Sequence, residues 1–137
     1  MLVDSNILVY AINADSSKHK IAKAFLKEFT TDLEVAHQNI LESLRVLTHP
    51  KFAQVMSVKN AMDAILSITS ACRLLSPNYQ TVYLTLEMIK KYKLSSDQVF
   101  DAYLAATALS NDIDTIATDN VADFKKLKEL TIINPFN

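Results

Sequence analysis

The segment SSDQVFDAYLAATAL, residues 95–109, is the stretch around which the rest of the chain can be arranged. Its apolar and small residues recur at the spacing of one helix face, which predicts a helix with a broad buried side. Ser95 or Ser96 is expected to cap the start of this helix, and Asp97 suits the positive end of the helix dipole. The predicted buried face comprises Leu94, Val99, Phe100, Tyr103, Leu104, Thr107 and Ala108.

Asp101 does not fit this helical pattern. It lies one turn inside the helix, on or beside the face that should be buried, and Asp97 on the same side adds only more negative charge. A carboxylate in this position needs a partner from another part of the chain.

Short apolar segments alternate with helical ones along the whole chain. Strands are expected at residues 1–3, 33–36, 73–75, 113–118 and 130–133. Helices are expected at residues 5–12, 18–29, 38–48, 57–71, 77–92 and 95–109, with a short helical turn at 121–127. Strands this short and apolar, separated by helices, predict an α/β fold in which a short parallel sheet is covered on both faces. No repeat or linker divides the chain, so we expect one domain over residues 1–137.

Composition excludes several functional classes. The chain has 137 residues, half of them apolar, and a formal net charge of -1, which gives no sign of a strongly basic nucleic-acid binder. It contains no glycine, so it has no Gly-rich phosphate loop. The single Cys72 excludes an internal disulfide and a cysteine-type zinc site. Without a signal peptide or an apolar run of membrane-spanning length, we expect a cytoplasmic protein with no membrane contact.

Acidic residues follow three of the predicted strands. Asp4 comes directly after the first strand, Glu42 lies early in the helix after the second, and Asp119 follows the fourth. Because the ends of parallel strands share one edge of the sheet, these acids and Asp101 can converge there. Two carboxylates about 5 Å apart repel by roughly 3 kcal/mol at an effective dielectric near 20, so such a cluster needs a cation. Oxygen ligands select Mg²⁺, or Mn²⁺ in its place, over zinc.

Each of these residues also has a purely structural interpretation. Asp4 alone suits an N-cap, and Glu42 alone suits a surface acid that stabilises a helix start. Arg45 lies one turn after Glu42, where it can pair with that acid, with a phosphate or with a carboxylate of a partner.

Several motifs occur together in the order and spacing of a known family. They are MLVDSNIL at 1–8, ESLRVLTHP at 42–50, FDAYLAATA at 100–108, TDNVADF at 118–124 and NP at 134–135. Together they resemble the PIN domain and, within it, the VapC-type toxins of bacterial and archaeal toxin–antitoxin pairs. The resemblance covers nearly the whole chain and implies a Rossmann-like α/β/α sandwich that acts as a Mg²⁺-dependent endoribonuclease on RNA. It also implies a cognate antitoxin whose tail blocks the site, and a homodimer formed through the early helices.

The resemblance assigns roles to individual positions. The first three acids of the family match Asp4, Glu42 and Asp101. We assign the fourth to Asp119, although the family spacing puts Asn120 where an acid is expected and Asp123 is a second alternative.

The expected reaction is metal-assisted hydrolysis of a phosphodiester bond. Asp4 and Asp101 would chiefly hold Mg²⁺, which lowers the pKa of a bound water and neutralises a phosphate oxygen. Glu42 or Asp119 would hold a second ion or align the attacking water. Asn6 is expected to orient Asp4 or the substrate. Thr118 is expected to position a metal-bound water. The full set of supporting positions is Asn6, Thr118, Asn120, Asp123, Arg45 and Asp97.

Two other functions are compatible with the sequence. One is a nuclease on the same fold that acts in RNA processing or decay without an antitoxin. The other is a catalytically inactive module that binds RNA or protein, in which the acids serve only as caps and surface charges. The intact first three acids favour the enzyme.

Overall fold

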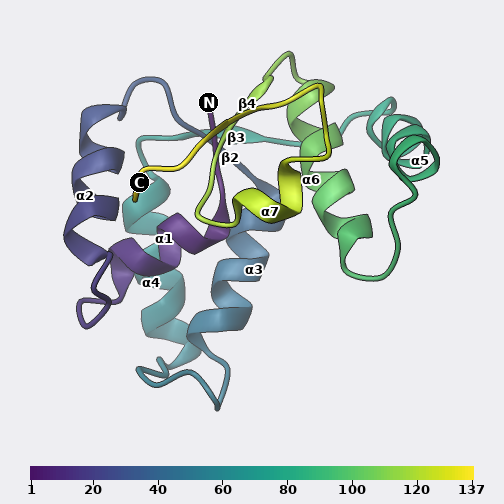
Figure 1. Ribbon diagram of the computed structural model, residues 1–137. Coiled ribbons are helices and arrows are strands. Elements are labelled where there is room, and N and C mark those ends of the chain that lie inside the picture. Colours follow the sequence, from purple (N-terminus) through teal and green to yellow (C-terminus); the bar gives the residue numbers. More distant parts are fainter.

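The computed structural model describes residues 1–137 and contains one five-stranded sheet (Figure 1). Its strands are β1 (Leu2–Val3), β2 (Glu34–Ala36), β3 (Arg73–Leu75), β4 (Thr115–Ala117) and β5 (Thr131–Ile133). They are arranged in the order β3-β2-β1-β4-β5, and every neighbouring pair is parallel. The expected α/β fold with a short parallel sheet is therefore confirmed.

Seven helices connect the strands. They are α1 (Ser5–Ile12), α2 (His19–Glu28), α3 (His37–Leu47), α4 (Val58–Thr69), α5 (Thr81–Tyr92), α6 (Gln98–Leu109) and α7 (Val121–Phe124). The start of α5 lies four residues later than expected, because Asn78 forms a turn in which its backbone N–H donates to Thr81 Oγ1 at 2.9 Å. None of these helices combines the length and the apolar character needed to cross a membrane.

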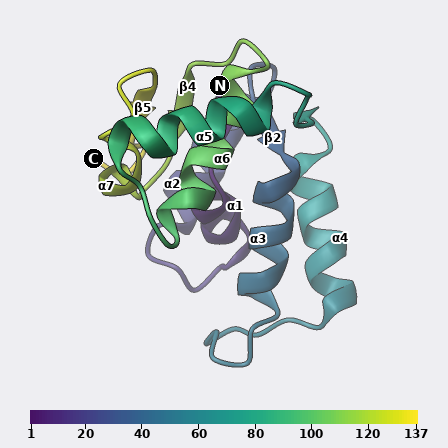
Figure 2. The same ribbon diagram turned by 90° about the vertical axis from the view of Figure 1, so that its right-hand side faces the viewer.

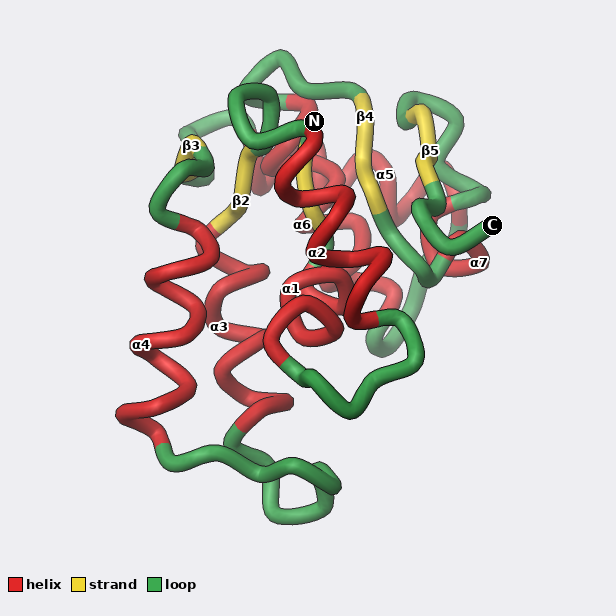
Figure 3. Tube along the Cα trace, turned by 90° about the vertical axis from the view of Figure 1, so that its left-hand side faces the viewer, coloured by secondary structure: helices red, strands yellow, loops and turns green.

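The two faces of the sheet are both buried under helices. Leu2 and Ile116 pack in one core with residues of α5 and α6, whereas Val3 and Ala117 pack in a second core with residues of α1 and α2. Side chains alternate between the faces of a strand, so adjacent apolar residues fill opposite cores. α5 lies in front of the sheet in Figure 2, and α2 lies in front of it in the opposite view of Figure 3. The arrangement is the α/β/α sandwich that the sequence predicted.

Helix α6 differs in detail from its prediction. Its buried side consists of Ala102, Leu104, Ala105, Ala106, Thr107 and Ala108, with Phe100 instead 61% exposed. The predicted serine cap is wrong, because Ser96 has a left-handed backbone (φ 54°) and Asp97 takes the cap position without a side-chain cap bond. A side-chain cap is typically made from an extended backbone, and neither Ser96 nor Asp97, whose φ is -61° and ψ -24°, has that conformation. Helix α6 therefore begins without a side-chain cap.

Left-handed backbone recurs in this chain without glycine. Lys93, at the end of α5, has φ 53°, and Asp112, after α6, has φ 62°. Lys93 and Ser96 therefore both shape the short connection that leads from α5 into α6.

Candidate active site

The carboxyl ends of β1 and β4 open into a cleft of about 470 Å³. Asp4 follows β1, Glu42 comes from α3, and Asp101 comes from the first turn of α6. The acidic residues that line the cleft are Asp4, Glu42, Asp97, Asp101 and Asp123. Four separate parts of the chain thus bring carboxylates to one end of the sheet, as predicted for the first three acids.

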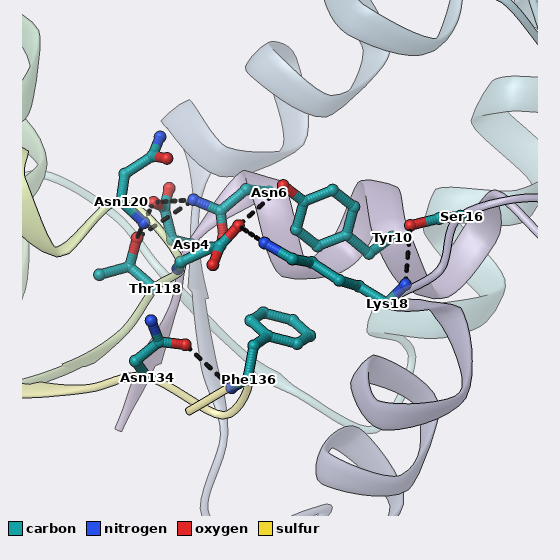
Figure 4. A network of polar contacts seen from close by, with 10 residues as sticks. Asp4, Asn6, Tyr10, Ser16, Lys18, Thr118, Asn120, Asn134 and Phe136 are labelled. Atoms are coloured by element: carbon teal, nitrogen blue, oxygen red, sulfur yellow. Dashed lines mark hydrogen bonds and ion pairs between the residues drawn. The ribbon is translucent and has the colours of Figure 1, made fainter.

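Asp4 is held firmly at the base of this cleft. Its side chain is an N-cap of α1, because Oδ1 accepts from the Ser5 backbone N–H at 2.7 Å. Its Oδ2 accepts from Asn6 Nδ2 at 2.8 Å and from Thr118 Oγ1 at 2.7 Å (Figure 4). Burial raises the pKa of Asp4, and the hydrogen bonds from Thr118 and Ser5 oppose this increase. Asp4 therefore caps a helix and lines the cleft at the same time.

Thr118 is fully buried and uses all of its hydrogen-bonding capacity within the chain. Besides donating to Asp4, its hydroxyl accepts from Asn6 Nδ2 at 3.1 Å and from the Asn120 backbone N–H at 3.0 Å. A hydroxyl has one donor hydrogen and two acceptor sites, so none is left for a water molecule. Thr118 therefore orients Asp4 and does not position a metal-bound water as predicted. Asn6 donates to the same carboxylate oxygen, as expected for a residue that orients Asp4.

Glu42 is positioned by two residues that the sequence analysis did not single out. Ser5 Oγ donates to Glu42 Oε2 at 3.2 Å. Gln38 Nε2 donates to Glu42 Oε1 at 2.8 Å and to the Phe100 carbonyl oxygen at 3.0 Å, which ties α3 to α6. The signal for Gln38 was its place one helical turn before Glu42, where side chains on one face meet.

Asp101 experiences the combined charge of the cleft. Burial, followed by the charges of Asp123, Asp4, Glu42 and Asp97, raises the pKa of Asp101 to about 7. None of the ion pairs in the chain involves these carboxylates, and Arg45 at the rim forms no ion pair either. The chain leaves the negative charge of the cleft without a basic partner.

Asp119 lies outside this cleft. It forms an ion pair with Lys18, and Tyr10 Oη donates to its Oδ2 at 2.9 Å. Burial acts to raise the pKa of Asp119, but hydrogen bonds from Lys18 and Tyr10 outweigh it and lower the pKa below its usual value of 3.8. The structure brings Asn120 and Asp123, and not Asp119, to the other acids.

The ammonium group of Lys18 lies between two aromatic rings. It lies 5.2 Å from the ring centre of Tyr10 and 5.1 Å from that of Phe136, and Figure 4 shows it between the two. Burial and the hydrogen bond to Asp119 raise the pKa of Tyr10 to about 12. We name Tyr10, Lys18, Asp119 and Phe136 the lysine clamp.

The PIN domain model matches residues 1–130. This chain belongs to the PIN domain family. The match covers every acid described above, so the resemblance inferred from the motifs is confirmed.

This PIN domain has relatives among named proteins and solved structures. Ribonuclease VapC43 of Mycobacterium tuberculosis is 28% identical over 138 aligned residues, which cover 93% of this chain and 92% of the relative. FitAcB from Neisseria gonorrhoeae has a TM-score of 0.74 at 19% identity, covering 99% of this chain and 98% of that one. A toxin–antitoxin complex from Klebsiella pneumoniae has a TM-score of 0.65 at 20% identity, covering 98% and 96%. The solved structures share the fold.

The donors in the cleft of this PIN domain fit a hard divalent cation in kind. They are carboxylate oxygens and the side-chain oxygens of Ser5, Asn6, Tyr10 and Asn120, and neither histidine nor cysteine lines the cleft. No group of three His, Cys, Asp or Glu side chains is close enough to surround an ion as the side chains stand. Full convergence is not required for Mg²⁺, which keeps several waters and is commonly held by only one or two carboxylates. The donor set therefore suits Mg²⁺ better than zinc.

Proposed function

We propose that this PIN domain is a Mg²⁺-dependent endoribonuclease that acts as the toxin of a VapBC-type toxin–antitoxin pair. The observation that carries the proposal is that Asp4, Glu42 and Asp101 line one cleft with no basic residue paired to them. Support also comes from the relatives, because VapC43 is named a ribonuclease and the Klebsiella pneumoniae structure is a toxin–antitoxin complex.

The residues of the cleft have different roles in the proposed reaction. When bound, Mg²⁺ supplies positive charge for the phosphate and lowers the pKa of water. Asp4, fixed by Thr118 and Asn6, and Asp101 are the residues that would hold the ion. Glu42, fixed by Ser5 and Gln38, would align the attacking water or help to hold a second ion.

Asp123 replaces Asp119 in our proposal as the fourth acid. Asp123 lines the cleft and its charge contributes to the raised pKa of Asp101, whereas Asp119 is paired with Lys18. Asn120 would add a neutral oxygen donor beside it. Asp119→Asn is then expected to retain more activity than Asp123→Asn.

The deciding experiment measures cleavage of single-stranded RNA with Mg²⁺ and with EDTA. We expect Asp101→Asn to lower kcat/KM by about 100-fold or more, since a catalytic metal contributes several kcal/mol. Asp63→Asn is the matched control, because Asp63 is an exposed acid on α4 that pairs only with Lys59. If highly purified wild-type protein and Asp101→Asn cleave RNA equally, the nuclease proposal is wrong.

The proposed partners can be tested separately from cleavage. A small protein encoded beside this one should bind it and inhibit cleavage if it is the antitoxin. Arg45, exposed at the rim of the cleft, is placed to meet a carboxylate of that partner. Light scattering of the purified protein tests the homodimer. RNA cleavage without any inhibitory neighbour would instead favour a role in RNA processing or decay.

A further inference from the structure

A second, larger hollow adjoins the acidic cleft. It is a groove of about 660 Å³ between α3 and α6, within the size range of sites for small ligands. The side chains that line it are His37, Gln38, Leu41, Glu42, Arg45, Pro77, Asp97, Phe100, Tyr103 and Thr107. On each helix these residues recur every three to four positions, so one face of α3 and one face of α6 form its walls. Figure 2 gives the view of the side on which both helices lie.

The groove and the cleft share part of their walls. Glu42, Arg45, Asp97 and Phe100 line both. A polynucleotide whose phosphate lies at the acidic residues of the cleft would therefore place the adjacent nucleotide in the groove. Phe100 marks the boundary, since it directly precedes Asp101 in α6.

The side chains of the groove match the parts of a nucleotide. The Phe100 ring is 61% exposed, which gives a flat apolar surface next to the acids. Arg45 is exposed and forms no ion pair, and the Tyr103 hydroxyl makes no hydrogen bond within the chain. Single-stranded nucleic acids are bound in this way, by aromatic surfaces for the bases and cations for the backbone.

Leu41 and Pro77 are the other apolar residues of the groove, and the remaining seven are polar or charged or carry a hydroxyl. The surface of the groove is mainly apolar, with polar groups of Gln38, Arg45 and Tyr103 set into it. This combination matches a base, which has apolar faces and a polar edge.

We infer that the groove binds an unpaired RNA base adjacent to the cleaved phosphodiester, with Phe100 stacking on the base and Arg45 contacting a neighbouring phosphate. The inference rests on the proposed ribonuclease function. It adds a binding subsite that would contribute to the choice of cleavage position.

The first test is a binding experiment that does not depend on cleavage. Single-stranded 12-nucleotide RNAs carry the fluorescent base 2-aminopurine at one position each, and Ca²⁺ replaces Mg²⁺. Stacking quenches 2-aminopurine, so we expect one position to be quenched by wild-type protein. Phe100→Ala and Phe100→Leu should lose this quenching, whereas Phe100→Trp should retain it. Tyr83→Ala is the control, because Tyr83 is an exposed aromatic residue of α5 outside the groove.

The second test uses cleavage with Mg²⁺. Phe100→Ala should lower kcat/KM by about tenfold or more, the effect expected for loss of one base–aromatic stack. The difference should vanish on an RNA that has an abasic ribose at the quenched position. Because Phe100 is exposed, its variants should keep the thermal midpoint of the wild type, which excludes unfolding as the cause.

The outcomes separate the subsite from the nuclease. Quenching that depends on Phe100, without cleavage by the wild type, would support the subsite and reject the proposed function. Cleavage that is the same in wild type and Phe100→Ala would reject the subsite and leave the function intact. Loss of antitoxin binding in Phe100→Ala with unchanged RNA binding would assign the groove to a protein partner and overturn the inference, as would absence of any quenched position.

Discussion

At the scale of single residues, the site depends on which carboxylates have partners. Glu34 and Asp119 are neutralised by basic groups, whereas Asp4, Glu42 and Asp101 are not. Unpaired charges are expensive to gather unless something outside the chain compensates them. This contrast among acids in one protein is the chemical basis for expecting a cation in the cleft.

The raised pKa of Asp101 predicts an unusual pH dependence of stability in the absence of metal. The folded protein holds a proton on Asp101 up to about pH 7, whereas an unfolded chain releases it near 3.8. The folded state thus binds more protons between these values, and the free energy of unfolding falls as pH rises from about 4 to about 7. Urea unfolding in EDTA at pH 5 and pH 7.5 measures this change.

Asp101→Asn is the variant for this pH experiment, because asparagine does not titrate. Its free energy of unfolding should depend less on pH over the same range than that of the wild type. An equal slope in the two proteins would show that Asp101 is not the titrating group.

The lysine clamp gives a second prediction at this scale. Lys18→Met should destabilise the protein by about 1 kcal/mol, the sum expected for a partly exposed ion pair and cation–π contacts. Asp119 has a lowered pKa, so the stability from this pair is present at neutral pH and is lost as pH falls below about 4. The difference between wild type and variant should shrink accordingly in acid unfolding. Lys20→Met is the control, because Lys20 is an exposed lysine of α2 without an acidic partner.

At the scale of elements, Thr118 connects the end of β4 to the acid that follows β1. We expect Thr118→Val to lower the free energy of unfolding by about 1–3 kcal/mol. The substitution removes the hydrogen bonds of Thr118 to Asp4, Asn6 and the Asn120 backbone N–H, and it leaves the buried carboxylate of Asp4 with one donor fewer. Removing a hydrogen bond that lowers the pKa of Asp4 should also raise that pKa further and weaken metal binding.

Thr85→Val is the matched control for this substitution. Thr85 is a buried threonine of α5 whose hydroxyl donates only to the Thr81 carbonyl oxygen within the same helix, at 2.7 Å. Equal losses of stability in the two variants, measured by urea unfolding, would remove the special role given to Thr118.

The elements themselves could be predicted from sequence, but their exact junctions could not. Short runs rich in apolar residues located all five strands, as expected for a covered parallel sheet. Only β1 is apolar and buried throughout, whereas the edge strands β3 and β5 are partly exposed. The start of α6 was misplaced, since the left-handed backbone of Ser96 follows from how the α5–α6 connection closes and not from the preference of serine for caps.

The same limit applies to the fourth acid. Asp119 was chosen because it follows a strand, and the sequence gives no sign that Lys18, 101 positions away, turns it from the cleft. The position of Asp101 was informative because an acid inside an apolar helix face has few structural explanations. Local pattern thus predicted that the first three acids lie at one cleft, whereas our proposal for the fourth acid depends on a long-range ion pair.

At the scale of the whole molecule, strand order explains why the cleft lies where it does. The connection from β1 leads to β2 on one side, and the later β4 pairs with β1 on the other side. In open parallel sheets, ligands bind at the carboxyl ends of strands where the order reverses in this way. Residues as distant as Asp4 and Asp101 meet there because the topology leaves room between the two connections.

Metal binding at this place should stabilise the entire fold. At a Mg²⁺ concentration 100 times the dissociation constant, linkage predicts about 2.7 kcal/mol of added stability, or several degrees in the thermal midpoint. Asp101→Asn should lose most of this increase and Asp63→Asn should keep it, as measured by differential scanning calorimetry. An increase of the same size in all three proteins would point to binding of Mg²⁺ elsewhere.

The absence of glycine at the left-handed positions gives a practical opportunity. Lys93 ends α5 in the conformation for which glycine is the preferred residue, and a side chain there costs about 1–2 kcal/mol of local strain. Lys93 lines neither the cleft nor the groove. Lys93→Gly therefore offers a way to increase the stability of the protein for storage, labelling or crystallisation without altering its activity.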